Sequence, residues 1–209
     1  MFTVGPVAEN SYLFRLDGSD RAVLVDPGEE APRLLAAIDS LGVQLDGILL
    51  THTHFDHIGA VAPVARATGA EVWVPEIEKI VLADINAYVP WPGFGPFENW
   101  DAEHTLTGGE KLELAGMEID VVFTPGHSPG HVTFSVPSEQ AVFSGDVLFQ
   151  GSVGRVDLPG GDWPTLLESI RSLVDGLPAE TTVYPGHMGV TTLGAERATN
   201  PFLAELARS

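Results

Sequence analysis

Short apolar runs alternate with helix-like patterns along the whole chain, and this alternation limits the possible folds more than any other feature. In the first half, strands are predicted at residues 12–16, 22–25, 47–50 and 71–74, and helices at 32–41 and about 59–68. In the second half, strands are predicted at 111–114, 117–123, 131–136, 141–144 and 182–184, and a helix at 163–173. This order predicts a mixed α/β fold with two sheets packed between helices.

A single domain is predicted over residues 1–209, because no Pro/Ser-rich linker or break in composition divides the chain. Residues 85–104 break the periodicity and combine five aromatic side chains with prolines and glycines. We interpret them as an ordered surface loop that either covers a pocket or packs its own base onto the domain.

The formal net charge is −19, from 29 acidic and 10 basic residues. Such a charge repels phosphate backbones and anionic headgroups, so neither nucleic acid nor a membrane is expected as a partner. The start of the sequence has no signal-peptide pattern and no run is long enough to span a membrane, which predicts a cytoplasmic protein. The chain has no cysteine, so any metal must be bound by histidine and carboxylate side chains.

One motif concentrates ligand-type side chains directly after a predicted strand. The run Thr51-His-Thr-His-Phe-Asp-His57 follows the apolar residues 47–50. In an extended segment His52, His54 and Asp56 share one face, and His57 follows at the predicted start of a helix. Three histidines and an aspartate in six residues have no ordinary packing explanation, so the motif predicts a metal site.

These four side chains exceed the needs of one catalytic metal, which keeps a position open for water, and therefore favour two metals. Three further candidates follow other strand-like runs: His127, Asp146 and His187, each preceded by glycine. We assign His52, His54 and His127 to one metal, Asp56, His57 and His187 to the other, and Asp146 as a bridging carboxylate. Nitrogen and oxygen ligands suit zinc first, with iron and manganese as alternatives.

The full ligand set resembles that of the metallo-β-lactamase superfamily, and the Val25-Asp-Pro-Gly28 turn is similar too. The resemblance extends over essentially the whole chain. It implies a four-layer αββα sandwich with the metals at strand ends between the sheets.

Four further motifs resemble the glyoxalase II (hydroxyacylglutathione hydrolase) group, especially its short-chain bacterial branch. They are Thr124-Pro-Gly-His-Ser-Pro-Gly-His131, Ser144-Gly-Asp146, Gly154-Arg-Val-Asp-Leu-Pro-Gly-Gly161 and Tyr184-Pro-Gly-His187. This resemblance implies hydrolysis of a small-molecule thioester of the S-lactoylglutathione type. The chain ends at Ser209, without the C-terminal helical region that helps to hold glutathione in full-length enzymes of this group.

In the expected mechanism, a hydroxide shared by the two metals attacks the thioester carbonyl, and Asp56 helps to orient it. Arg155 is our candidate for binding an anionic group of the substrate, with a salt bridge to Asp157 as the alternative. His131 is expected to be a buried hydrogen-bonded residue, and His104 an ordinary surface residue. Asp26 is expected to tie its turn to the ligand loop.

Two other activities stay open on the sequence. A persulfide dioxygenase uses one iron on two histidines and one aspartate, for which His52, His127 and Asp146 suffice. A lactonase or arylesterase would use the same ligands for a different hydrolysis.

Overall fold

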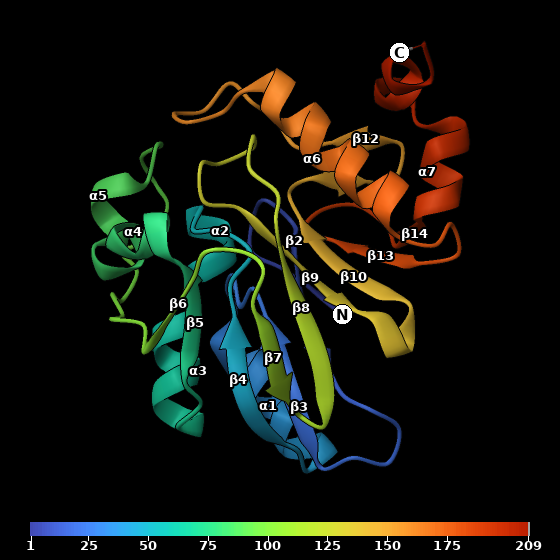
Figure 1. The fold of residues 1–209 in the computed structure, drawn as a ribbon. Helices are drawn as coiled ribbons and strands as arrows, with labels where there is room; N and C mark the ends of the chain where they lie inside the picture. Colours follow the sequence, from blue (N-terminus) through green and yellow to red (C-terminus); the bar gives the residue numbers. More distant parts are fainter. Residues whose placement is uncertain (209) are drawn as a thin grey trace. The chain divides into compact units, whose positions relative to one another are not determined.

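The computed structural model describes residues 1–208, which form two compact units. The first unit comprises Met1–Thr107 and Glu113–Met117, and the second comprises Gly108–Leu112 and the chain from Glu118 onward. Each unit contains a sheet accompanied by helices (Figure 1). The predicted α/β class is therefore confirmed, whereas a single domain over residues 1–209 stays a prediction.

The sheet of the first unit has the strand order β1-β2-β3-β4-β5-β6 within the described residues. Its strands are β1 (Phe2–Val4), β2 (Glu9–Phe14), β3 (Arg21–Val25), β4 (Gln44–Leu49), β5 (Val72–Pro75) and β6 (His104–Leu106). The pairs β1·β2 and β2·β3 are antiparallel, and the pairs from β3 to β6 are parallel. Because parallel neighbours end at the same edge of a sheet, the segments that follow β4 and β5 lie side by side.

Two helices cover one face of this first sheet. The helices of the unit are α1 (Ala31–Leu41), α2 (Phe55–Ile58), α3 (Val61–Thr68), η1 (Glu76–Glu78), α4 (Lys79–Ala83) and α5 (Ile85–Tyr88). α1 buries Leu34 and Ile38, which are one turn apart, and α3 buries Val61 and Val64. These side chains share one apolar cluster with Ile48 of β4, so α1 and α3 pack against the same face (Figure 1).

The sheet of the second unit has the order β14-β13-β10-β9-β8-β7. Its strands are β7 (Lys111–Leu114), β8 (Met117–Phe123), β9 (Val132–Val136), β10 (Ala141–Gly145), β13 (Thr182–Pro185) and β14 (Thr191–Thr192), and β11 (Leu148–Phe149) pairs with β12 (Ser152–Val153). β13 is parallel to β10, and β9 is antiparallel to both β8 and β10. β8, β10 and β13 therefore run in one direction, and their carboxyl ends share one edge.

An amphipathic helix covers this second sheet. The helices of the unit are η2 (Pro137–Glu139), α6 (Trp163–Gly176), α7 (Leu193–Thr199) and η3 (Pro201–Arg208). Leu166, Ile170 and Leu173 recur along one side of α6 at helical spacing and are buried. They cluster with Val142 of β10 and Val183 of β13, which places α6 against the middle of the sheet (Figure 1).

Every predicted strand and helix overlaps an observed one, with ends that differ by a few residues. The surface loop predicted at residues 85–104 is shorter than expected, because Ile85–Tyr88 is helical and His104 opens β6. The remaining elements that were not predicted are short. In the described part of the chain, no helix is long and apolar enough to cross a membrane.

Candidate metal centre

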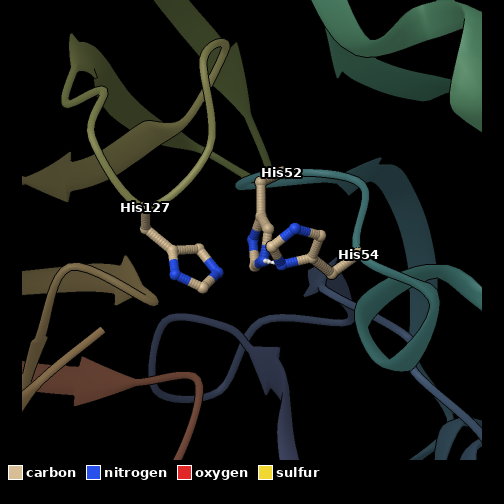
Figure 2. A group of neighbouring side chains, drawn as sticks. All are labelled: His52, His54 and His127. Atoms are coloured by element: carbon tan, nitrogen blue, oxygen red, sulfur yellow. Dashed lines mark hydrogen bonds between the residues drawn. The ribbon is translucent and has the colours of Figure 1, made fainter. Parts of the chain in front are cut away.

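Two histidines converge in the segment that follows β4. His52 is fully buried and His54 partly buried, and Nε2 of His52 lies 3.2 Å from Nδ1 of His54 (Figure 2). With Zn–N bonds of about 2.0–2.1 Å, two ligand nitrogens of a tetrahedral site lie roughly 3.3 Å apart. The two nitrogens therefore already have the spacing of ligands that share one metal.

Asp56 and His57 lie in α2, the helix that follows directly. Because α2 begins at Phe55, Asp56 is helical, and the prediction that it shares an extended face with His52 and His54 is wrong. His57 is buried, its ring centroid is 4.1 Å from that of His52, and its Nε2 is 3.8 Å from Oδ2 of Asp56. The first unit thus brings together the four predicted ligands of the motif.

Asp26 orients two of these histidines from the turn after β3. Its Oδ1 accepts a hydrogen bond from the Thr51 amide at 2.7 Å, and its Oδ2 accepts from Thr51 Oγ1 at 2.6 Å and from His57 Nδ1 at 3.0 Å. Since the Thr51 hydroxyl donates to Asp26, His52 Nδ1 must donate to Thr51 Oγ1, which is 3.0 Å away. Both rings therefore present Nε2 as the nitrogen with a lone pair. The predicted tie between Asp26 and the ligand loop is confirmed.

Glu9 on β2 is a buried carboxylate that the sequence reasoning missed. Its Oε2 is hydrogen-bonded to Ser11 Oγ at 3.1 Å, and its Oε1 lies 3.8 Å from Nδ1 of His57. Burial raises the pKa of Glu9 well above its ordinary value, and the nearby His57 opposes that shift. A glutamate at the start of an apolar strand usually marks a solvated strand end, so the local pattern carries no signal of this position.

The second unit brings the other three predicted ligands together where β8, β10 and β13 end. Oδ2 of Asp146 lies 3.5 Å from Nε2 of His127 and 3.6 Å from Nε2 of His187. Nδ1 of His127 lies 2.7 Å from the carbonyl oxygen of Arg155. Because a carbonyl only accepts, Nδ1 is the protonated nitrogen, and Nε2 presents the lone pair toward Asp146. His127, also labelled in Figure 2, thus has the tautomer that a metal ligand needs.

His131 has a different role from His127. It is fully buried, its Nε2 accepts a hydrogen bond from the Asp146 amide at 3.1 Å, and its Nδ1 is 3.1 Å from Thr124 Oγ1. Both ring nitrogens are therefore committed to the protein, which confirms that His131 is a buried hydrogen-bonded residue. His104 lies partly exposed, stacked on Trp73 and 2.6 Å from a carboxylate oxygen of Glu71.

Arg155 forms a salt bridge to Asp157, which is the predicted alternative to substrate binding. Its Nε and Nη2 donate to the two carboxylate oxygens of Asp157 at 2.6 and 2.8 Å. This bidentate pair lowers the pKa of Asp157 to about 2. The guanidinium is half exposed, and its role in substrate binding stays a prediction.

Two glycines lie directly against the backbone of the predicted carboxylate ligands, Asp56 and Asp146. A Cβ on Gly28 would lie 1.8 Å from the carbonyl oxygen of Asp56, and a Cβ on Gly154 would lie 1.8 Å from that of Asp146. No side chain fits either position without moving the ligand's backbone.

The aromatic residues of the predicted loop surround Phe55, the neighbour of His54. The ring centroids of Trp91, Phe94 and Phe97 lie 6.1, 4.8 and 6.0 Å from that of Phe55. Asn86 and residues 89–96 also line a surface hollow. Residues 85–104 therefore pack around Phe55 and also border a surface hollow.

A comparison with known proteins shows which family the chain is similar to. The family model described as the Metallo-beta-lactamase superfamily matches residues 4–187, a span that includes all seven predicted ligands. The hydroxyacylglutathione hydrolase GloC of Haemophilus influenzae is 36% identical over 200 residues, which cover 90% of this chain and 89% of that protein.

Solved structures support the fold over nearly the whole length. The B3 metallo-β-lactamase BLEG-1 matches with a TM-score of 0.91 and 40% identity, covering 96% of this chain and 97% of that chain. TTHA1623, solved in a di-iron-bound form, matches with a TM-score of 0.80 and 44% identity, covering 97% and 98%. The implied metallo-β-lactamase fold is therefore confirmed.

Proposed function

Because the chain belongs to the metallo-β-lactamase superfamily, we propose that it is a metal-dependent hydrolase that cleaves small-molecule thioesters, as glyoxalase II enzymes do. The likeness to a hydroxyacylglutathione hydrolase at 36% identity supports this class of substrate. The net charge of −19 favours a small molecule over nucleic acid.

The proposed cofactor is a pair of divalent metal ions bound by the seven predicted ligands. His52, His54 and His127 would hold one metal, Asp56, His57 and His187 the other, and Asp146 would bridge the two. The observation that carries this proposal is the tautomer of three of the imidazole rings. His52, His57 and His127 each commit Nδ1 to a protein acceptor, which turns Nε2 into the donor atom for a metal.

Zinc is the metal that these ligands suit first, and the di-iron form of TTHA1623 makes iron the leading alternative. Bound divalent metals acidify water to a pKa near 7 and polarise a substrate carbonyl. The seven predicted ligands fit such a pair, since all of their side chains offer nitrogen or oxygen donors.

The chain's own residues supply the remaining steps. The Asp56 carboxylate would accept a hydrogen bond from the attacking water and orient it. Water adds to the thioester carbonyl, the C–S bond breaks, and the proton from water ends on the departing sulfur, which gives a carboxylic acid and a thiol. Arg155 would bind a carboxylate of the thiol carrier at the rim, in competition with Asp157.

Measurements on a single protein preparation test both the proposed metal cofactor and the proposed reaction. Purified protein is analysed for metal content, and the same preparation is assayed with S-lactoylglutathione, an uncharged thioester, a lactone, an aryl ester, a β-lactam and a thiol persulfide with oxygen-uptake recording. We expect two metals per chain and a higher kcat/KM on a thioester than on any other substrate tested.

The other outcomes identify the alternatives. One iron per chain with oxygen uptake would identify a persulfide dioxygenase. Two metals per chain with the highest kcat/KM on the lactone, aryl ester or β-lactam would support the metal centre and refute the thioester as substrate.

A further inference from the structure

In the ligand segment Thr51–His54, predicted metal ligands alternate with threonines that are hydrogen-bonded to other parts of the chain. His52 and His54 carry the converging nitrogens, and Thr51 and Thr53 alternate with them. Thr51 is anchored by Asp26, as described above. Thr53 lies between the two histidines and has a separate anchor on a different element.

That anchor is Glu78, a buried carboxylate at the end of η1. Its Oε2 accepts a hydrogen bond from the Thr53 amide at 2.8 Å and from Thr53 Oγ1 at 3.0 Å. Glu78 is only 5% exposed. The parallel pairing of β4 with β5 brings it there, because η1 follows β5 just as the ligand segment follows β4.

The two hydrogen bonds fix the peptide that joins the histidines. Both donors of Thr53, its backbone amide and its hydroxyl, are hydrogen-bonded to the same oxygen of Glu78. Rotation of the Thr53 backbone would move the two imidazoles apart and would leave a buried amide unsatisfied. The anchor therefore maintains the 3.2 Å separation between the ring nitrogens.

We propose that Glu78 is a positioning residue that holds His52 and His54 in the geometry of a shared metal site before the metal binds. The inference rests on the proposed function, since it needs these histidines to be ligands. Glu78 itself is not a ligand, because it acts through the backbone and hydroxyl of Thr53.

Three substitutions separate the position of the acceptor from its charge. Glu78→Ala removes the acceptor, Glu78→Asp withdraws it by one methylene, and Glu78→Gln keeps an acceptor oxygen at the same reach. Glu196→Asp is the matched control for Glu78→Asp, because Glu196 is also buried and accepts from a backbone amide (Gly151, 2.8 Å) and a threonine hydroxyl (Thr191, 2.6 Å).

The readouts are the zinc dissociation constants from competition with a chromophoric chelator, the absorption spectrum of the cobalt-loaded protein, and the unfolding midpoint of the metal-free protein. We expect Glu78→Ala and Glu78→Asp to weaken one of the two zinc sites about 10- to 100-fold and to alter the cobalt spectrum. Glu78→Gln should stay within about threefold of wild type, and Glu196→Asp should leave both zinc dissociation constants unchanged even if its unfolding midpoint falls.

If Glu78→Asp keeps wild-type zinc dissociation constants and a wild-type cobalt spectrum, the inference is overturned, whether or not its unfolding midpoint falls. This variant provides the test even if Glu78→Ala does not fold. Equal weakening of zinc binding in Glu196→Asp would also overturn the inference, because any loss of stability would then be enough to weaken the site. A wild-type chain that binds no metal would overturn the proposed function and this inference together.

Discussion

Replacing Asp146 with alanine tests whether one carboxylate serves two metals. Its Oδ2 lies 3.5 and 3.6 Å from the Nε2 atoms of His127 and His187, which we assign to different metals. The variant would then remove one ligand from each metal. Four ligands bind structural zinc with roughly 10–16 kcal/mol, so one ligand contributes about 2.5–4 kcal/mol. At about 1.4 kcal/mol per factor of ten, each affinity should fall roughly 10²- to 10³-fold.

The assay measures metals per chain after dialysis against metal-free buffer, together with thioester turnover and the circular dichroism of the metal-free protein. Asp146→Ala should lose both metals and at least two orders of magnitude in kcat/KM, with an unchanged spectrum. Asp175→Ala is the control, because it removes an exposed carboxylate of α6 that pairs with Arg197. A variant that keeps two metals per chain and near-normal turnover would refute the bridging assignment.

Three further results are expected. Trp91→Ala should raise KM for bulky thioesters several-fold with little change in the unfolding midpoint, because Trp91 is 40% exposed; a large midpoint drop at constant KM would make it a packing residue. Arg155→Ala should raise KM up to about fivefold for carboxylate-bearing thioesters and leave an uncharged thioester unaffected; equal losses on both would assign it to the scaffold. Asp157→Asn should lower the midpoint above about pH 4, and this difference should vanish toward pH 2, because a depressed carboxyl pKa stabilises only above the folded value. Midpoints measured at several pH values would contradict this if the difference stayed constant.

The secondary-structure elements and the candidate ligands could be found in the sequence because both depend on local pattern. Apolar residues at helical spacing, such as Leu34 and Ile38, predict the buried face of a helix without knowledge of its partners. His52, His54 and His57 stand out because so many imidazoles in one short run have no packing explanation. The placement of Asp146 and His187 after parallel strands follows from the same reasoning about strand ends.

The residues that hold the ligands were not predictable, because they act across long stretches of chain. Glu9 and Glu78 reach their partners through strand pairing, and only the folded sheet shows that these glutamates are buried. The start of α2 at Phe55 was missed for a related reason: the preceding residue, His54, makes no side-chain capping hydrogen bond, so the sequence carries no cap signal there.

The close approach of Gly28 to Asp56 and of Gly154 to Asp146 sets limits for redesigning substrate preference. Random libraries that include either glycine should yield almost exclusively inactive clones, even though neither residue offers a side chain to metal or substrate. A Cβ on Gly93, in the aromatic segment, would meet no atom of the described chain within 4 Å beyond its two neighbouring residues. Its positive φ still accommodates asparagine or aspartate better than other side chains. We therefore expect substitutions around residues 89–96, which line the surface hollow, to change substrate preference without disturbing the predicted ligand loops.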